Sequence, residues 1–220
     1  MTSWWRRLLR PGEAGNGEQR WVVIDVEASG LDPNHDRLLA IAGLGLGFER
    51  GAPVLQLADS FEVILRQEGS AVETEVDKPN ILLHGIGVGA QRGGTPSRDA
   101  LEAFRLWLAG APILGYHVAF DQTLIQRYCS SHLGRRLSNQ WVDLEHVVRL
   151  IVPELPDRSL DAAMAHFGVT CSVRHQAVAD ALATAEVLLH SWPAARAQMG
   201  GRSDFRSLRR LAARYRWLAR

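Results

Sequence analysis

Residues 21–26 read Trp21-Val22-Val23-Ile24-Asp25-Val26, an almost unbroken run of β-branched and apolar side chains. Such a run is typical of a central strand that is buried on both faces of a sheet. A turn-forming stretch at residues 30–34 ends it, and residues 38–46 and 54–65 supply two further strands. The chain is therefore expected to open as a three-stranded meander.

Helical patterns alternate with short strands after an irregular, Gly-rich stretch at residues 67–94. Thr95 is expected to cap a helix that has Pro96 at its first position. Further strands are predicted at 112–116 and 141–142, and further helices at 120–133, 143–151, 159–167 and 177–192. This order predicts an α/β fold, with a mixed five-stranded sheet flanked by helices.

The size and composition of the chain fit a single soluble globular domain. It has 220 residues, of which 46% are hydrophobic and 22% charged. Two cysteines, Cys129 and Cys171, are too few for a disulfide framework or a zinc site, so a reducing, cytoplasmic location is expected. A net charge of +1 gives no global attraction to nucleic acid. Neither a membrane-spanning run nor a secretory signal is recognisable.

Three parts are predicted along the chain. Residues 1–20 form a basic and apolar appendage with a linker, residues 21–192 the main domain, and residues 193–220 a basic, helical tail. The tail places Phe205 and Leu208 on one helical stripe among arginines. That stripe can pack on its own domain, or the helix can bind phosphates, a partner or a membrane surface.

Carboxylates mark the end of the first strand and the start of a later helix. Asp25 and Glu27 are two positions apart, so their side chains point to the same face of a strand. The carboxyl ends of strands are where α/β sheets bind ligands, although such a pair alone is common by chance. Asp121 lies in the first turn of a predicted helix, where the helix dipole alone also favours an acid.

A third segment contains His175 and Asp180, five residues apart. Asp180 falls on a helix face that is otherwise small and apolar, with Ala177 and Ala183 beside it. An acid on a face that should pack against the sheet is costly unless it is paired or binds a metal ion. Of the three segments, this one is the hardest to explain by packing alone.

Together the three segments resemble the three sequence motifs of the DEDDh 3′–5′ exonuclease family. The first is Asp25-Val26-Glu27-Ala28-Ser29-Gly30-Leu31-Asp32, the second contains Phe120-Asp121, and the third is His175-x4-Asp180. The family includes the proofreading ε-type subunit of bacterial replicative polymerase, ribonuclease T and oligoribonuclease. The resemblance covers about residues 21–192, and it implies a ribonuclease-H-like exonuclease domain.

This resemblance also implies a mechanism that uses two divalent ions, Mg²⁺ or Mn²⁺. Asp25, Glu27, Asp121 and Asp180 would hold the ions, which stabilise the attacking and leaving oxygens of an in-line displacement. His175 would take the proton from the attacking water. The expected products are nucleoside 5′-monophosphates, released from the 3′ ends of single-stranded DNA or short RNA.

Several positions are expected near the substrate terminus. Two residues depart from the family pattern: the family often has threonine where this chain has Ala28, and asparagine where it has His117. The full set of expected substrate-binding residues is Ala28, Ser29, Gly30, Leu31, His84, His117 and Phe120.

Two alternatives remain at this point. A proofreading subunit that binds a replicative DNA polymerase would ordinarily need a tail for polymerase and clamp binding. The 28 residues after Trp192 contain no convincing clamp motif, which favours a stand-alone enzyme. A non-catalytic module that binds nucleic acid is the other alternative, and the intact set of five catalytic residues argues against it.

Overall fold

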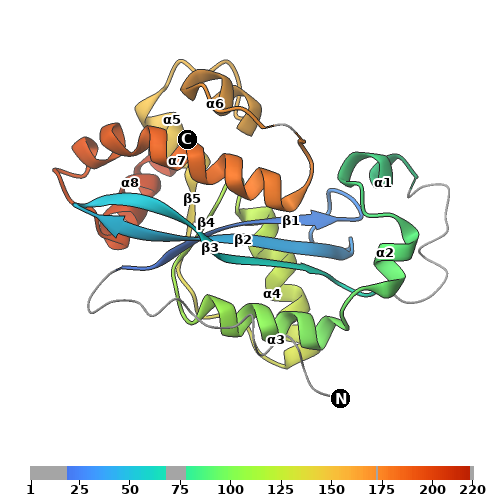
Figure 1. The fold of residues 1–220 in the computed structure, drawn as a ribbon. Coiled ribbons are helices and arrows are strands. Elements are labelled where there is room, and N and C mark those ends of the chain that lie inside the picture. Colours follow the sequence, from blue (N-terminus) through green and yellow to red (C-terminus); the bar gives the residue numbers. More distant parts are fainter. Residues whose placement is uncertain (1–18, 68–77, 172, 219–220) are drawn as a thin grey trace.

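A computed structural model describes residues 19–67, 78–171 and 173–218. Its centre is a five-stranded mixed sheet with helices on both faces (Figure 1), which confirms the predicted architecture. The strand order is β3-β2-β1-β4-β5. The strands are β1 (Trp21–Ala28), β2 (Leu38–Glu49), β3 (Ala52–Ile64), β4 (Ile113–Gly115) and β5 (Trp141–Asp143).

Strand β1 lies in the middle of this sheet. It runs antiparallel to β2 and parallel to β4, while β3 pairs antiparallel with β2 and β5 pairs parallel with β4. The predicted meander is therefore confirmed. Since β1 has neighbours on both edges and helices on both faces, it needs the apolar, β-branched sequence that identifies it.

Eight helices are seen in the described part of the chain. The predicted helices correspond to α3 (Ser97–Leu108), α4 (Ala119–Leu133), α5 (Leu144–Ile151), α6 (Leu160–Phe167) and α7 (Ala177–Gln198). The tail forms α8 (Phe205–Leu218), and α1 (Lys78–His84) and α2 (Val88–Gly93) are two short helices that the sequence did not predict.

The expectation that residues 67–94 are irregular throughout is wrong where α1 and α2 form. Each helix is only two turns or less, too short for a periodic apolar stripe to show in the sequence. A contact from a distant segment holds α2 instead, because the Gln67 backbone N–H donates to the carbonyl of the buried Gln91 at 2.9 Å.

Thr95 does not cap α3, contrary to the prediction. Helix α3 begins at Ser97 and has no side-chain cap. The Thr95 backbone instead extends the edge of β3: its N–H donates to the Ile64 carbonyl at 2.8 Å, and its carbonyl accepts from the Arg66 N–H at 2.7 Å. Backbone pairing at the sheet edge therefore takes the place of a helix cap.

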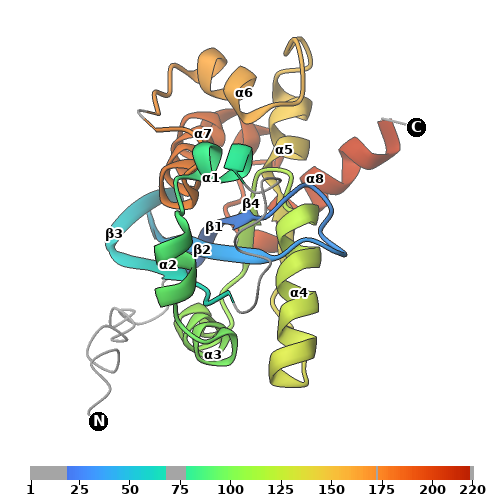
Figure 2. The ribbon, with the colours of Figure 1, turned by 90° about the vertical axis from the view of Figure 1, so that its right-hand side faces the viewer.

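Helices cover both faces of the sheet (Figure 2). Two apolar clusters fill the space between sheet and helices, one on each face. Val22 and Ile24 point to the face covered by α3 and α4, whereas Trp21 and Val23 point to the face covered by α5, α7 and α8. Side chains alternate along a strand, so the next residues of the second series are Asp25 and Glu27. The two carboxylates therefore face α7.

The C-terminal region packs on the domain. Helix α7 continues through Pro193 to Gln198, past the predicted boundary at residue 192, and α8 lies against α5. Phe205 and Leu208 of α8 are buried in the cluster under α7. Of the two alternatives for this tail, the structure therefore shows its apolar stripe packed on its own domain.

The structure does not test the predicted division of the chain into three parts. The N-terminal appendage falls on residues 1–18, outside the described residues, and the division of the chain into three parts stays a prediction. Within the part that the structure covers, no helix combines the length and the apolar character needed to cross a bilayer.

Candidate active site

Strand β1 presents the first two carboxylates of the site beside small neighbours. Asp25 is paired in register with Ala42 of β2, and Glu27 with Ala40. Paired residues on adjacent strands point to the same face of a sheet, so each carboxylate has a methyl group next to it. The two alanines leave space above this part of the sheet.

Asp121 joins the site from the first turn of α4. Its side chain is buried, and its carboxylate accepts a hydrogen bond from the Val26 backbone N–H. Val26 lies between Asp25 and Glu27 on β1. The short strand β4 ends at Gly115, so this N–H beyond its last residue is available to Asp121. The bond fixes the third carboxylate beside the first two.

Asp180 completes the acidic group from the first turn of α7, where it is also buried. One carboxylate oxygen accepts from the Arg174 guanidinium, and the other accepts from the His175 backbone N–H at 3.1 Å. Helix α7 lies across β1 and β2, which brings Asp180 over the carboxylates of β1.

The four acids are near enough to perturb one another. Burial, followed by repulsion from Asp121 and Asp180, raises the pKa of Asp25 well above its usual range. Burial and the charges of Asp25 and Asp180 raise the pKa of Glu27 to about 9. The positive charge of Arg174 opposes both shifts.

Burial also raises the pKa of Asp121, with repulsion from Asp143 and Glu27 as further causes. Carboxylates that repel one another in a buried setting hold protons or bind cations. The structure thus brings Asp25, Glu27, Asp121 and Asp180, which come from three separate segments, into one electrostatic cluster.

The donor chemistry of this cluster suits a divalent metal ion. All four side chains offer oxygen atoms, which hard cations such as Mg²⁺ and Mn²⁺ prefer. Among the residues that the structure describes, no three or more His, Cys, Asp or Glu side chains are already arranged around a common metal position. The oxygen donors therefore suit such ions by their chemistry, although they do not yet surround one common metal position.

His175, the predicted base, sits directly before α7. Its backbone adopts the left-handed conformation, with φ of 62°, and its N–H is bonded to Asp180. The side chain is exposed to solvent. The structure thus anchors the backbone of His175 at the cluster and leaves its imidazole on the solvent side.

The predicted substrate residues in the loop between β1 and β2 have distinct environments. The Ser29 hydroxyl donates to the Asp36 carboxylate at 3.2 Å and accepts from the Arg37 N–H at 2.9 Å, so it closes the loop. Gly30 packs so tightly that a Cβ would come within 2.5 Å of Asp36. Ala28 is partly buried against the cluster above α3 and α4, whereas Leu31 is 93% exposed.

The other predicted substrate residues lie on three further segments. His84 ends α1 with a buried side chain, whose Nδ1 accepts from the Ile86 N–H at 3.0 Å. His117 is exposed, has a φ of 56°, and donates its N–H to Asp143 at 3.0 Å. Phe120 packs against the apolar cluster beneath α4.

Sequence reasoning missed two charged residues of this region, Asp143 and Arg174. Asp143 ends β5, caps α5 through the Glu145 N–H at 3.1 Å, and repels Asp121. Asp143 could have been predicted from the sequence, because it is an acid at the carboxyl end of a predicted strand, as Asp25 is. Arg174 directly precedes His175, and nothing in the sequence pattern marks its pairing with Asp180.

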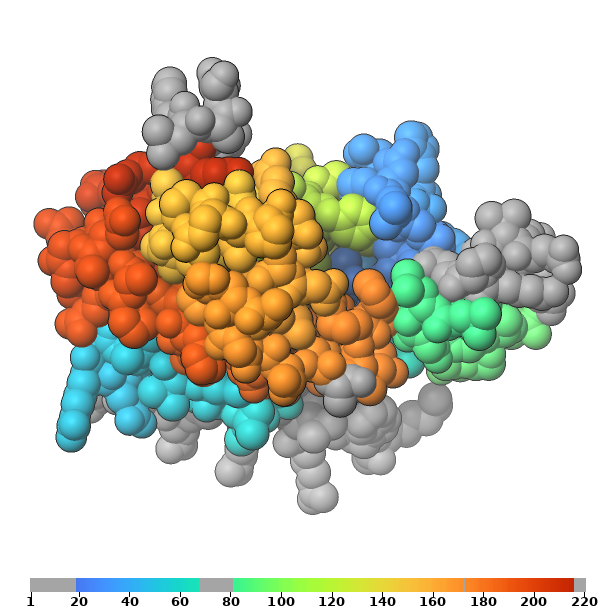
Figure 3. All heavy atoms as spheres, turned by 90° about the horizontal axis from the view of Figure 1, so that it is seen from above, coloured from blue at the N-terminus to red at the C-terminus, as the bar shows by residue number. Residues whose placement is uncertain are grey.

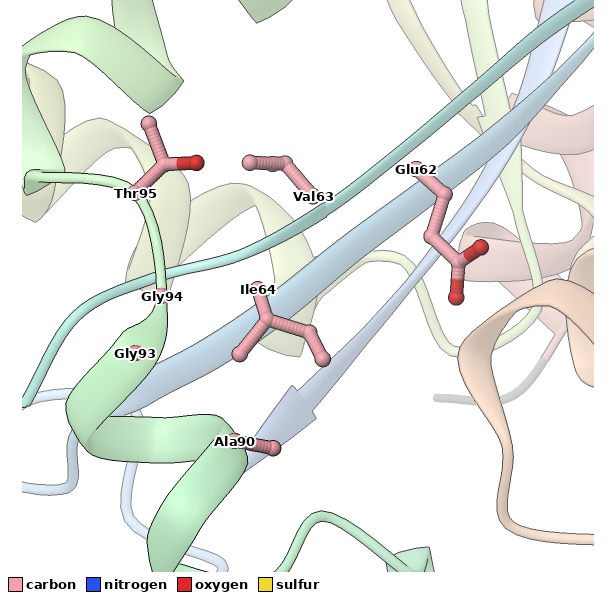
Figure 4. Close-up of a pocket in the computed structure, with 7 residues that line it drawn as sticks. All are labelled: Glu62, Val63, Ile64, Ala90, Gly93, Gly94 and Thr95. Carbon is pink, nitrogen blue, oxygen red and sulfur yellow. The ribbon is translucent and has the colours of Figure 1, made fainter.

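Figure 3 shows a recess between the orange segment at the start of α7, the green α1 and the blue β1–β2 loop. A second hollow, of about 440 Å³, lies at the edge of β3 (Figure 4). None of the predicted site residues lines the second hollow, which has a single carboxylate. Its lining residues are Glu62, Val63, Ile64, Ala90, Gly93, Gly94 and Thr95.

Comparison with known proteins decides the family. The exonuclease family model RNase_T matches residues 22–188 of this chain. The chain belongs to the DEDD-type 3′–5′ exonuclease family. This match spans the strands of the sheet and the segments that carry all four acids and His175.

Curated relatives of this exonuclease chain include the PolC-type DNA polymerases III. The protein from Oceanobacillus iheyensis is 25% identical over 171 residues, which are 78% of this chain and 11% of the relative. The protein from Clostridium perfringens is 25% identical over 190 residues, 86% of this chain and 12% of the relative. The chain thus spans about a tenth of the length of the curated relatives it matches.

Solved structures confirm the ribonuclease-H-like exonuclease fold. E. coli exonuclease I in complex with a dT13 oligonucleotide has a TM-score of 0.64 at 20% identity, over 86% of this chain and 45% of that one. The zinc-bound form of the E. coli exonuclease I complex with single-stranded DNA has a TM-score of 0.65, also at 20% identity, over 83% of this chain and 43% of that one. Family and fold together support a nuclease-type hydrolase.

Proposed function

We propose that this chain is a metal-dependent 3′–5′ exonuclease that removes terminal nucleotides from single-stranded DNA or short RNA. The observation that carries the proposal is the meeting of Asp25, Glu27, Asp121 and Asp180, from β1, α4 and α7, in one buried electrostatic cluster. Membership of the exonuclease family supports the same chemistry. The products would be nucleoside 5′-monophosphates.

The four acids would hold two divalent ions, Mg²⁺ or Mn²⁺. When bound, such ions stabilise the attacking and leaving oxygens of an in-line displacement at phosphorus. The protein contributes the positions of its oxygen donors: the Val26 N–H holds Asp121 beside β1, and the His175 N–H holds Asp180 above it. The zinc-bound exonuclease I among the solved structures supports a metal-dependent site.

His175 would accept the proton of the attacking water. Imidazole is the usual side chain for this task near neutral pH. The backbone bond from His175 to Asp180 keeps the residue at the edge of the carboxylate cluster. Its ring is exposed to solvent.

A single-stranded end is the favoured substrate because apolar side chains are exposed on the segments that frame the recess. Leu31 lies on the β1–β2 loop, Leu82 and Leu83 lie on α1, and Val173 lies just before α7, with exposed fractions of 93%, 86%, 53% and 45%. Unstacked bases contact such surfaces without sequence preference, whereas paired bases are shielded within the duplex. The oligonucleotide complex of E. coli exonuclease I supports this inference.

A proofreading role beside a DNA polymerase is the second candidate. It is favoured by the relatives, which are polymerases that match this chain over about a tenth of their length. A pull-down with a replicative polymerase separates the candidates: stable co-purification supports proofreading, and its absence supports a stand-alone enzyme.

The proposed activity is tested with 5′-labelled single-stranded DNA and RNA oligonucleotides in the presence of Mg²⁺ or Mn²⁺. The wild type should shorten them stepwise from the 3′ end, and a blocked 3′ end should protect them. Asp121→Ala should reduce the rate at least about a hundredfold, because it removes one of the metal-binding carboxylates. Glu49→Ala, at an exposed acid that ends β2 seven residues beyond Ala42, the register partner of Asp25, is the matched control and should keep full activity.

Undiminished shortening by the Asp121→Ala variant would refute the assignment of the site. Shortening from the 5′ end would refute the direction and leave the site intact.

A further inference from the structure

Both carboxylate oxygens of Asp180 accept hydrogen bonds from the segment that precedes α7. The Arg174 guanidinium donates to Oδ1 through Nη1, and the His175 backbone N–H donates to Oδ2 at 3.1 Å. Oδ1 cannot bind the guanidinium and a metal ion along the same direction. A cation that approaches this oxygen from the side of the guanidinium would therefore replace Arg174.

Arg174 has a second anchor outside the cluster. Its Nε donates to Oδ1 of Asp161, at the start of α6, at 2.7 Å. The Asp161 side chain is 63% exposed and that of Arg174 is 23% exposed. The guanidinium thus bridges a buried acid of the site and an acid at the surface. If it left Asp180, it would still keep a charged partner at Asp161.

The charge of Arg174 acts on the cluster beyond Asp180. Its positive charge also acts on the carboxyl groups of Asp25 and Glu27. One positive charge among four acids relieves only part of their repulsion, whereas two divalent ions supply four charges. The charge of Arg174 therefore neutralises only part of the negative charge that two divalent ions would neutralise.

We infer that Arg174 is an internal counter-ion of the carboxylate cluster, which a divalent ion displaces from Asp180, so that Arg174 sets the metal affinity of the site. The inference rests on the proposed function, because it assumes that the four acids bind metal. It adds a residue that tunes affinity for the ions without binding them. If the pairs of Arg174 with Asp161 and Asp180 were purely structural, replacing Arg174 would lower the stability and leave the Mn²⁺ affinity unchanged.

The test measures Mn²⁺ binding by calorimetry and melting temperature with and without Mn²⁺. Arg174→Gln should bind Mn²⁺ about tenfold more tightly than the wild type, because no partly buried, charge-assisted pair must be broken. It should melt at a lower temperature than the wild type without metal and gain more on adding Mn²⁺. Arg174→Lys loses the two-sided bridge but keeps the charge, so its affinity should fall between those two.

Arg135→Gln is the control for net charge. Arg135 pairs with Glu102 at 3.0 Å, beyond the far end of α4 from Asp121. That helix has 15 residues, so the control lies about 20 Å from the site along the helix axis. Its Mn²⁺ affinity should equal that of the wild type.

Equal or weaker Mn²⁺ binding by Arg174→Gln would overturn the inference. So would an equal loss of melting temperature with and without the ion. If Arg174→Gln folds only when Mn²⁺ is present, the inference is supported; if it folds in neither condition, Arg174→Lys decides, and affinity no greater than wild type overturns it. A wild type that neither binds Mn²⁺ nor cleaves nucleic acid would instead refute the proposed function, and this inference with it.

Discussion

Replacing Glu27 by glutamine should stabilise the metal-free protein and at the same time abolish its nuclease activity. Glutamine has the shape of the protonated carboxyl but cannot ionise. In the folded protein, burial together with repulsion by Asp25 and Asp180 raises the pKa of Glu27 from 4.5 to about 9. At pH 7 the native side chain therefore keeps a proton that the unfolded chain releases.

The size of the effect follows from that difference. Each pH unit above 4.5 favours the unfolded state by about 1.4 kcal/mol, which gives about 3 kcal/mol at pH 7 as an upper limit. Glu27 is partly exposed, so water screens some of this cost, and we expect a gain of about 1–3 kcal/mol. For a chain of this length, that gain raises the melting temperature by roughly 2–10 °C.

The assay is thermal unfolding at pH 5, 7 and 8.5, without metal and with millimolar Mn²⁺. Glu27→Gln should melt higher than the wild type at pH 7 and 8.5 without metal, and the two should converge near pH 5. With Mn²⁺, the variant should gain less than the wild type. Glu49→Gln, at an exposed acid that ends β2, is the matched control and should change neither result. A Glu27→Gln protein that is less stable than the wild type at pH 8.5 without metal would refute the electrostatic argument.

Three further predictions follow from the same structure. First, the raised pKa of Glu27 means that the protein without metal is most stable at low pH and loses stability as the pH rises from about 4.5 toward about 9. The increase in melting temperature on adding Mn²⁺ should therefore be larger at pH 8 than at pH 6. Second, Gly30→Ala should cost about 1–3 kcal/mol, because its Cβ would come within 2.5 Å of Asp36, whereas Gly89→Ala, with open space around it, should be neutral or slightly stabilising in urea unfolding. Third, Leu208→Ala should cost about 2–5 kcal/mol in the same assay if α8 is part of the domain core; a loss below about 1 kcal/mol would show that α8 is dispensable.

The elements that the sequence predicted correctly are those whose pattern reflects burial. Residues 21–26 carry so many β-branched side chains that a central strand is the natural result, and the two-residue spacing places Asp25 and Glu27 on one face. The helices that were missed, α1 and α2, are short, and α2 is held by a contact such as the bond from the Gln67 N–H to the Gln91 carbonyl. Such contacts join residues whose proximity depends on the completed fold.

The candidate site divides in the same way. The residue types and their order identified Asp25, Glu27, Asp121 and Asp180, and the structure brings these four together. The pairing of Arg174 with Asp180 could not be predicted, because it depends on the left-handed turn at His175 that directs the chain back toward α7. The roles of His175 and of the substrate-binding residues stay predictions.

Asp25 and Glu27 of the cluster come from the first strand, and Asp121 comes from the middle of the chain. Asp180 comes from the first turn of α7, in the last quarter of the chain. A polypeptide emerging from the ribosome therefore carries Asp25 and Glu27 long before Asp180 exists. In the proposed mechanism, the early segments lack a complete set of metal ligands until α7 docks, so the unfinished chain would have no nuclease activity. On that proposal, cleavage of nucleic acid would begin only once the fold that brings the four acids together is complete.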